Sequence, residues 1–112
     1  MMDTEMSAFK GSAQYAFFAS DLANVNRSLT PWTIFMGHRP MYSSSDNATG
    51  IDVANMPWGT DLEDLLMKNQ VDLCLWGHVH NAEVTCPLYR GECVSTTPDE
   101  TYDAPIHAVI VR

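Results

Sequence analysis

Three of the four histidines in this chain come directly after apolar segments that end in glycine. His38 follows the apolar residues 32–36, and both His78 and His80 follow the apolar residues 71–76. A neutral imidazole is the commonest protein ligand for zinc, iron and related metals. One histidine in such a place more often caps a strand or lines the edge of a pocket. The repeated context favours a metal site that the three imidazoles share.

The elements that would position these histidines are two strands joined by a helix. Apolar β-formers bounded by glycine are typical of buried strands, which predicts strands over 32–36 and 71–76. Between them, Thr60 and Glu63 have the spacing of a capping box at the start of a helix. A strand, helix and strand in this order form a right-handed parallel crossover. Both histidine-bearing ends should therefore emerge at one edge of the sheet, where ligands bind in α/β folds.

The rest of the chain supplies the other elements of an α/β fold. Ser12 is placed to cap a first helix, whose buried stripe is predicted to be Tyr15, Phe18, Leu22 and Val25. The inner face of the second helix is predicted to be Leu62, Leu65 and Leu66. A long polar loop over 41–56 precedes the second helix, two extended pieces lie within 81–94, and a third strand is expected over 104–111. His107 falls inside that last strand, where a core role or a hydrogen-bonded role is expected.

The charge balance excludes some classes of partner. The chain has 112 residues and a formal net charge of −8, and its six Lys and Arg residues do not cluster. A protein that binds nucleic acid through its phosphates needs a basic patch, so no nucleic-acid partner is expected. No apolar run approaches the roughly 18 residues needed to span a bilayer, so no membrane association is expected. An anionic substrate would need a local charge reversal, which a bound metal supplies directly.

The cysteines and two asparagine motifs indicate an oxidising compartment. Cys86 and Cys93 are seven residues apart, a spacing that suits a short disulfide-closed loop, while Cys74 falls inside an apolar strand and should behave as a buried hydrophobe. Asn26 and Asn47 each begin a triplet that matches the N-glycosylation acceptor pattern. We therefore expect a secreted protein, or one from a vacuolar or lysosomal type of compartment.

The motifs around the histidines resemble those of a known family. Residues 37–42 read Gly-His-Arg-Pro-Met-Tyr, residues 77–81 read Gly-His-Val-His-Asn, and residues 85–89 read Thr-Cys-Pro-Leu-Tyr. They resemble the last two metal-binding motifs of the purple acid phosphatases, which are calcineurin-like metallophosphoesterases. The resemblance implies an αββα sandwich, of which residues 1–112 would form the C-terminal half, incomplete at both ends. Within it, the strand–helix–strand segment would be a βαβ unit.

The same resemblance implies a chemistry and a set of ligands. It implies hydrolysis of phosphate monoesters at acid pH by a binuclear centre of Fe(III) with Zn, Mn or Fe(II). His38 and His78 would bind the divalent ion, and His80 would bind the ferric ion. The family motifs that carry aspartates, an iron-binding tyrosine and an Asn-His pair have no counterpart in this sequence, so the chain alone is expected to be inactive or nearly so. The expected partners are a phosphate ester and either the missing N-terminal half or a second copy of the chain.

Four residues beside the histidines have predicted supporting roles. Arg39 is placed to contact a substrate phosphate or, alternatively, to form a salt bridge at the strand end. Tyr42 is expected to pack under the following loop rather than to take part in chemistry. Asn81 and Glu83 are candidates for orienting a ligand histidine, as groups beyond the ligands often do.

Two other functional classes are open. One is a non-catalytic module in which His38, His78 and His80 hold a single zinc ion, with water or a carboxylate as the fourth ligand. The other is a phosphoesterase-like protein whose metal site is vestigial. Ala82 and Val84 favour this last possibility, because the family often has tyrosine and arginine at these positions.

Overall fold

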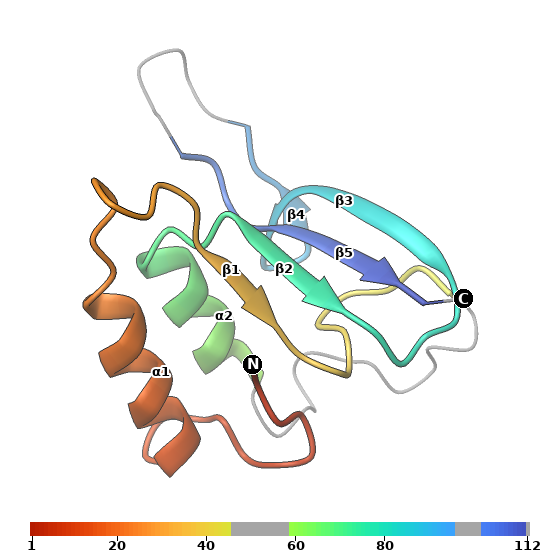
Figure 1. Ribbon diagram of the computed structural model, residues 1–112. Helices are drawn as coiled ribbons and strands as arrows, with labels where there is room; N and C mark the ends of the chain where they lie inside the picture. The colour runs from red at the N-terminus through yellow and green to blue at the C-terminus, as the bar shows by residue number, and fades with distance from the viewer. Residues whose placement is uncertain (46–58, 96–101, 112) are drawn as a thin grey trace.

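The computed structural model describes residues 1–45, 59–95 and 102–111, which form one mixed sheet with two helices (Figure 1). In chain order the elements are α1 (Ala13–Ala23), β1 (Ile34–Met36), α2 (Gly59–Lys68), β2 (Leu73–Trp76), β3 (Ala82–Tyr89), β4 (Glu92–Cys93) and β5 (Ile106–Ile110). The strand order is β1-β2-β5-β3-β4. Neither described helix is long and apolar enough to cross a membrane.

The predicted parallel crossover is confirmed. β1 and β2 run parallel, with Met36 opposite Leu75, and β2 also runs parallel to β5. β1 and β2 each begin two residues later than expected, and side-chain contacts reinforce the backbone hydrogen bonds between the residues that precede them. The Asp72 carboxylate accepts a hydrogen bond from the Thr33 amide at 2.7 Å and pairs with Arg27 at 2.6 Å. Arg27 thereby ties the turn after α1 to the start of β2.

The first helix begins as predicted. The Ser12 hydroxyl accepts a hydrogen bond from the Tyr15 amide at 3.1 Å, which satisfies one of the free N–H groups of the first turn. Phe18 and Leu22 are buried, whereas Phe17 faces outward. Of the predicted stripe, Phe18 and Leu22 join the core and Tyr15 packs against it, whereas Val25 lies beyond the end of α1.

The capping box predicted for the second helix is wrong. α2 begins at Gly59, so Thr60 lies inside the helix, and the Glu63 carboxylate does not serve as a cap. Instead Glu63 is buried and accepts hydrogen bonds from the Tyr42 hydroxyl and, at 2.7 Å, from the Arg90 amide. These donors come from distant segments and compensate the cost of burying a carboxylate.

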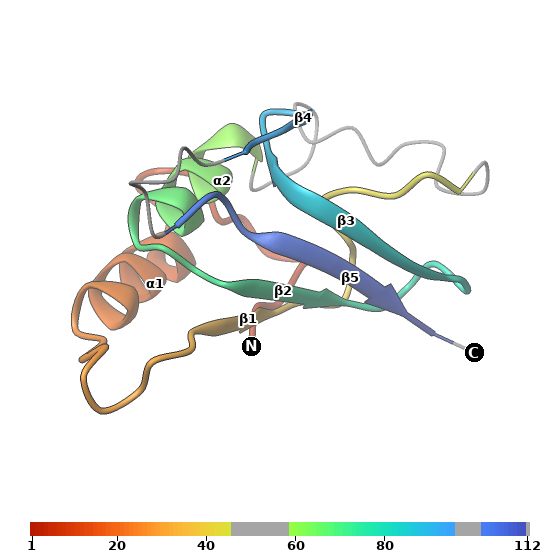
Figure 2. The same cartoon turned by 90° about the horizontal axis from the view of Figure 1, so that it is seen from above.

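The core lies between the two helices and one face of the sheet (Figure 2). The α2 leucines predicted to face inward are all buried, and they join Phe35, Cys74, Trp76 and Val109 from the strands. Of the expected αββα sandwich, the described residues thus form one sheet and the helices on one of its faces. The opposite face of that sheet is not covered by any described helix or strand.

The predicted disulfide is present. Cys86 and Cys93 are bonded, with their Cα atoms 5.8 Å apart, and they link β3 to β4 across the turn between them. Cys74 is a buried free thiol, as expected. The disulfide holds the two-residue strand β4 against β3 at the far edge of the sheet.

His107 occupies the core position expected for it. Its side chain is 1% exposed, and its Nδ1 accepts a hydrogen bond from the Trp76 indole N–H at 3.1 Å. Burial lowers the pKa of His107 from 6.5 to about 4. The imidazole is therefore neutral in the folded protein at neutral pH.

Folding stability should depend on pH through His107. Because the folded-state pKa lies below the unfolded value, the contribution is fully present above about pH 6.5 and is lost as the pH falls towards about 4. The loss should reach about 3 kcal/mol. Urea unfolding of the wild type and of His107→Gln across this range measures it, with the exposed His80→Gln as control. An equal pH slope in the wild type and His107→Gln would contradict this assignment.

Candidate functional site

The segments that leave β1 and β2 stay bonded to each other at the carboxyl edge of the sheet. The Gly37 amide donates to the Leu75 carbonyl at 3.1 Å, and the Gly77 amide donates to the His38 carbonyl at 2.9 Å. A Cβ atom at Gly37 would lie 2.5 Å from the ring of Trp76, closer than real atoms approach. Glycine is therefore required where the chain turns towards His38.

His38 and His78 lie in direct contact. The Nδ1 atom of His78 is 3.1 Å from the Nε2 atom of His38, and the ring centroids are 5.0 Å apart. His78 has a φ of 65°, in the left-handed region that residues other than glycine seldom adopt. This turn takes the chain sharply out of the direction of β2. The His78 ring is therefore placed against the ring of His38, which follows β1.

Arg39 contacts the other nitrogen of His78. Its Nη1 lies 3.2 Å from His78 Nε2, and its Nε donates to the Glu5 carboxylate at 2.5 Å. A guanidinium has only donors, so this contact uses the Nε2 lone pair and leaves the His78 proton on Nδ1, where it is donated to His38. The Arg39 hydrogen bond lowers the pKa of Glu5, and burial, followed by the charge of Arg39, lowers the pKa of His78. Of the two predicted contacts for Arg39, the structure contains the salt bridge.

His80 stands apart from this pair. It is exposed, in the turn between β2 and β3. Among the described residues, no three side chains from His, Cys, Asp and Glu come together in a group that could hold a metal ion. The structure thus brings together two of the three predicted metal ligands.

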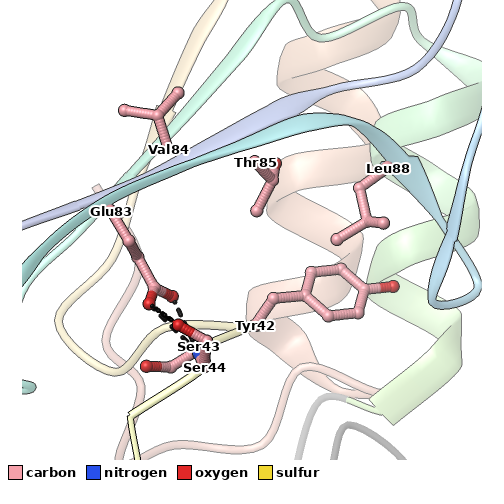
Figure 3. Close-up of a pocket in the computed structure, with 7 residues that line it drawn as sticks. All are labelled: Tyr42, Ser43, Ser44, Glu83, Val84, Thr85 and Leu88. Carbon is pink, nitrogen blue, oxygen red and sulfur yellow. Dashed lines mark hydrogen bonds between the residues drawn. The ribbon is translucent and has the colours of Figure 1, made fainter.

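Glu83 holds the segment that follows Tyr42 (Figure 3). Its carboxylate accepts hydrogen bonds from the Ser44 amide at 3.1 Å and from the Ser44 hydroxyl at 2.6 Å, and the Asn81 side chain donates to it at 3.1 Å. Burial opposes ionisation of Glu83, but the hydrogen bonds from Ser44, Asn81 and Ser43 together lower its pKa. The Asn81 Oδ1 atom is buried and has no hydrogen-bond partner among the residues that the structure describes. Glu83 therefore holds the loop and Asn81 supports Glu83, and within the described part of the chain neither side chain is hydrogen-bonded to an imidazole.

Tyr42 lies between the sheet and α2. Its hydroxyl donates to Glu63 and accepts from the Gly91 amide at 3.2 Å, and its ring packs edge-on against His107. Burial and the Glu63 carboxylate raise its pKa. A hydroxyl held in this way supports the loop, in agreement with the packing role expected from the sequence.

A hollow of about 330 Å³ lies between this loop and β3 (Figure 3). It is lined by Tyr42, Ser43, Ser44, Glu83, Val84, Thr85 and Leu88. The Glu83 carboxylate points at Ser44 rather than into the open part of the hollow. Sequence reasoning missed the Glu83–Ser44 and Glu5–Arg39 contacts, because their partners are 39 and 34 residues apart and carry no local pattern.

One of the two glycosylation motifs falls in the described residues. Asn26 is exposed in the turn after α1, where its side-chain oxygen accepts a hydrogen bond from the Ser28 amide at 3.0 Å. Asn47 lies outside the described residues, as does most of the long loop predicted over 41–56. Asn26 is accessible, and its modification stays a prediction.

Comparison with known proteins identifies relatives over nearly the whole chain. The calcineurin-like phosphoesterase family matches residues 2–82. "Probable inactive purple acid phosphatase 24" of Arabidopsis thaliana is 39% identical, over 96% of this chain and 18% of that protein. Human "Acid phosphatase type 7" is 36% identical, over 86% of this chain and 25% of that protein.

A solved structure has the same fold. A purple acid phosphatase from yellow lupin (Lupinus luteus) seeds superposes with a TM-score of 0.82 at 36% identity, over 96% of this chain and 20% of the lupin chain. The chain therefore spans about a fifth of the length of the lupin protein.

Replacing Glu83 should release the Ser44 segment. Glu83→Gln removes the charge that two Ser44 donors share, and hydrogen bonds to charged groups contribute about 1.5–3 kcal/mol. We expect the Ser44 amide to exchange with solvent at least about tenfold faster, as measured by hydrogen-exchange NMR. Glu92→Gln, in the exposed strand β4, is the matched control. An unchanged Ser44 rate would show that Glu83 does not hold the loop.

Proposed function

Because the chain belongs to the calcineurin-like phosphoesterase family and resembles its purple acid phosphatases, we propose that it carries the histidine part of an acid phosphatase site. In this proposal the complete site hydrolyses phosphate monoesters, and the 112-residue chain does not hydrolyse them by itself. The observation that carries the proposal is the arrangement of His38, His78 and Arg39 at the sheet edge.

The described residues do not fit a binuclear metal centre of Fe(III) with Zn, Mn or Fe(II). The facing nitrogens of His38 and His78 bond each other, and the remaining His78 nitrogen accepts from Arg39. The nearby carboxylates are also engaged, Glu5 by Arg39 and Glu83 by Ser44. Two ions need many more oxygen and nitrogen ligands than this edge offers. No catalytic step is therefore assigned to this chain alone.

The relatives support both parts of the proposal. The human relative is named an acid phosphatase, whereas the Arabidopsis relative is named a probable inactive purple acid phosphatase. The disulfide between Cys86 and Cys93 and the exposed Asn26 motif support a secreted or vacuolar setting, where thiols oxidise.

A single-zinc module is the alternative that one observation favours. His38 and His78 are already in contact, so an ion that took the place of the hydrogen bond between their facing nitrogens would meet both imidazoles. An ion held there would have two imidazoles and solvent, with His80 reaching it only after its turn moved. Such a site would bind one ion and would not require catalysis.

The proposal predicts no phosphatase activity for the isolated chain. An aryl phosphate assay at acid pH, with ferric iron and zinc supplied, should give the rate of the metal-containing buffer. His38→Ala should give the same rate, because an incomplete site has no turnover to lose. Hydrolysis by the wild-type chain that His38→Ala abolishes would overturn the proposal.

A further inference from the structure

Two polar contacts bound the hollow of about 330 Å³ between β3 and the loop that contains Tyr42, one at each end (Figure 3). At one end the Glu83 carboxylate accepts hydrogen bonds from the Ser44 amide and hydroxyl. At the other end the Tyr42 hydroxyl donates to Glu63 and accepts from the Gly91 amide at 3.2 Å. The second contact therefore depends on the turn between β3 and β4.

That turn presents two backbone amides to the rest of the chain. Arg90 has a φ of 55° and Gly91 has a φ of 79°, and a two-residue hairpin of this type requires both to be positive. The amides of its two central residues take no part in pairing the strands, so they can donate elsewhere. Arg90 donates to the Glu63 carboxylate at 2.7 Å, and Gly91 donates to the Tyr42 hydroxyl.

Glu63 needs these donors because its side chain is only 5% exposed. A buried carboxylate is stable only where donors or cations replace the water that it has lost. Among the described residues its partners are the Tyr42 hydroxyl, the Arg90 amide and, at 3.7 Å, the Arg90 guanidinium. Arg90 supplies two of these three contacts. A movement of the turn would therefore leave Glu63 and Tyr42 without most of their support.

β4 depends on the disulfide for its place at the edge of the sheet. It has only two residues, which pair with Leu88 and Tyr89, and it is the last strand in the sheet order. Two strands paired over so short a length are marginally stable by themselves. β3 is held independently, because it also pairs with β5. Reduction of the bond between Cys86 and Cys93 would thus weaken β4 and the turn but not β3.

We propose that the Cys86–Cys93 disulfide is a redox-sensitive fastening that holds the Tyr42 end of the hollow in place. Reduction lets the turn leave Glu63, so Tyr42 loses its position between the sheet and α2 and that end of the hollow loosens. The contact between Glu83 and Ser44 does not involve the turn and remains. This proposal goes beyond the proposed function and does not depend on it.

The reductant in this reaction is a dithiol. One of its thiolates attacks the sulfur of Cys93, an exposed residue, and Cys86 leaves as a thiolate that takes up a proton. The second thiolate of the reductant then displaces Cys93, so the chain gains two thiols and the reductant becomes a cyclic disulfide. Two electrons and two protons pass to the chain, and the oxidised form of the dithiol reverses the reaction.

The test is amide hydrogen exchange, measured by NMR on the full 112-residue chain before and after treatment with a dithiol. Alkylation and mass spectrometry should count two additional thiols after treatment. The Arg90 and Gly91 amides should then exchange at least about tenfold faster, since native disulfides in small domains usually contribute that much or more to stability. The Gly77 amide, which donates to the His38 carbonyl, should keep its rate because β3 and the other strands stay paired.

A second measurement follows Tyr42 itself. With fluorotyrosine in the chain, the fluorine NMR signal that Tyr42→Phe removes belongs to this residue. Reduction should move that signal towards the position of free fluorotyrosine. The double variant Cys86→Ser with Cys93→Ser should behave as the reduced chain does, and the dithiol should not change it further.

Glu83→Gln is the matched control for the opposite end of the hollow. In the oxidised chain it removes the contact to Ser44 but leaves the turn in place, so the Gly91 amide and the Tyr42 signal should not change. The two ends of the hollow are then shown to be held separately.

Four results would overturn the proposal. The first is a disulfide that the dithiol does not reduce in the folded chain. The second is an unchanged Gly91 rate and an unchanged Tyr42 signal in the reduced chain. The third is an equal acceleration of the Gly77 amide, since the disulfide would then hold the whole fold rather than one end of the hollow. The fourth is a response of the double serine variant to the dithiol.

Discussion

The parallel pairing of β1 with β2 determines where the chemistry-bearing side chains of this protein lie. Once Met36 is opposite Leu75, the residues that follow the two strands must leave the sheet next to each other. The Trp76 ring then fills the space over Gly37, and backbone hydrogen bonds keep the two exits together. The contact between His38 and His78, forty residues apart in sequence, is a consequence of that register.

The parts of the fold that follow from local patterns could be predicted from the sequence. The apolar runs, the Ser12 cap and the leucines of α2 were recognised because periodicity and capping act over a few residues. The role of Glu63 was not, because its donors come from Tyr42 and Arg90, each more than 20 residues away. A buried carboxylate and a capping carboxylate look the same in a sequence, and only the tertiary contacts distinguish them.

The candidate site shows the same division. The glycine–histidine pattern predicted a common edge, and the edge exists. The contacts that the residues of this edge make could not be predicted. The Glu5–Arg39 pair joins residues 34 positions apart, and the contact of His78 with His38 depends on a left-handed turn at His78. The uncovered face of the sheet has a related cause. A fully apolar strand indicates burial on both sides, but it does not identify what lies on the second side.

In the proposed function, His38 and His78 form one part of a metal site whose other ligands come from outside the described residues. Zinc binding to the isolated chain, counted by equilibrium dialysis at micromolar free zinc, tests this claim most directly. The account predicts less than one tightly bound ion per chain, because the imidazole nitrogens are bonded to each other and to Arg39. One or more tightly bound ions per chain, lost in His38→Ala, would contradict it.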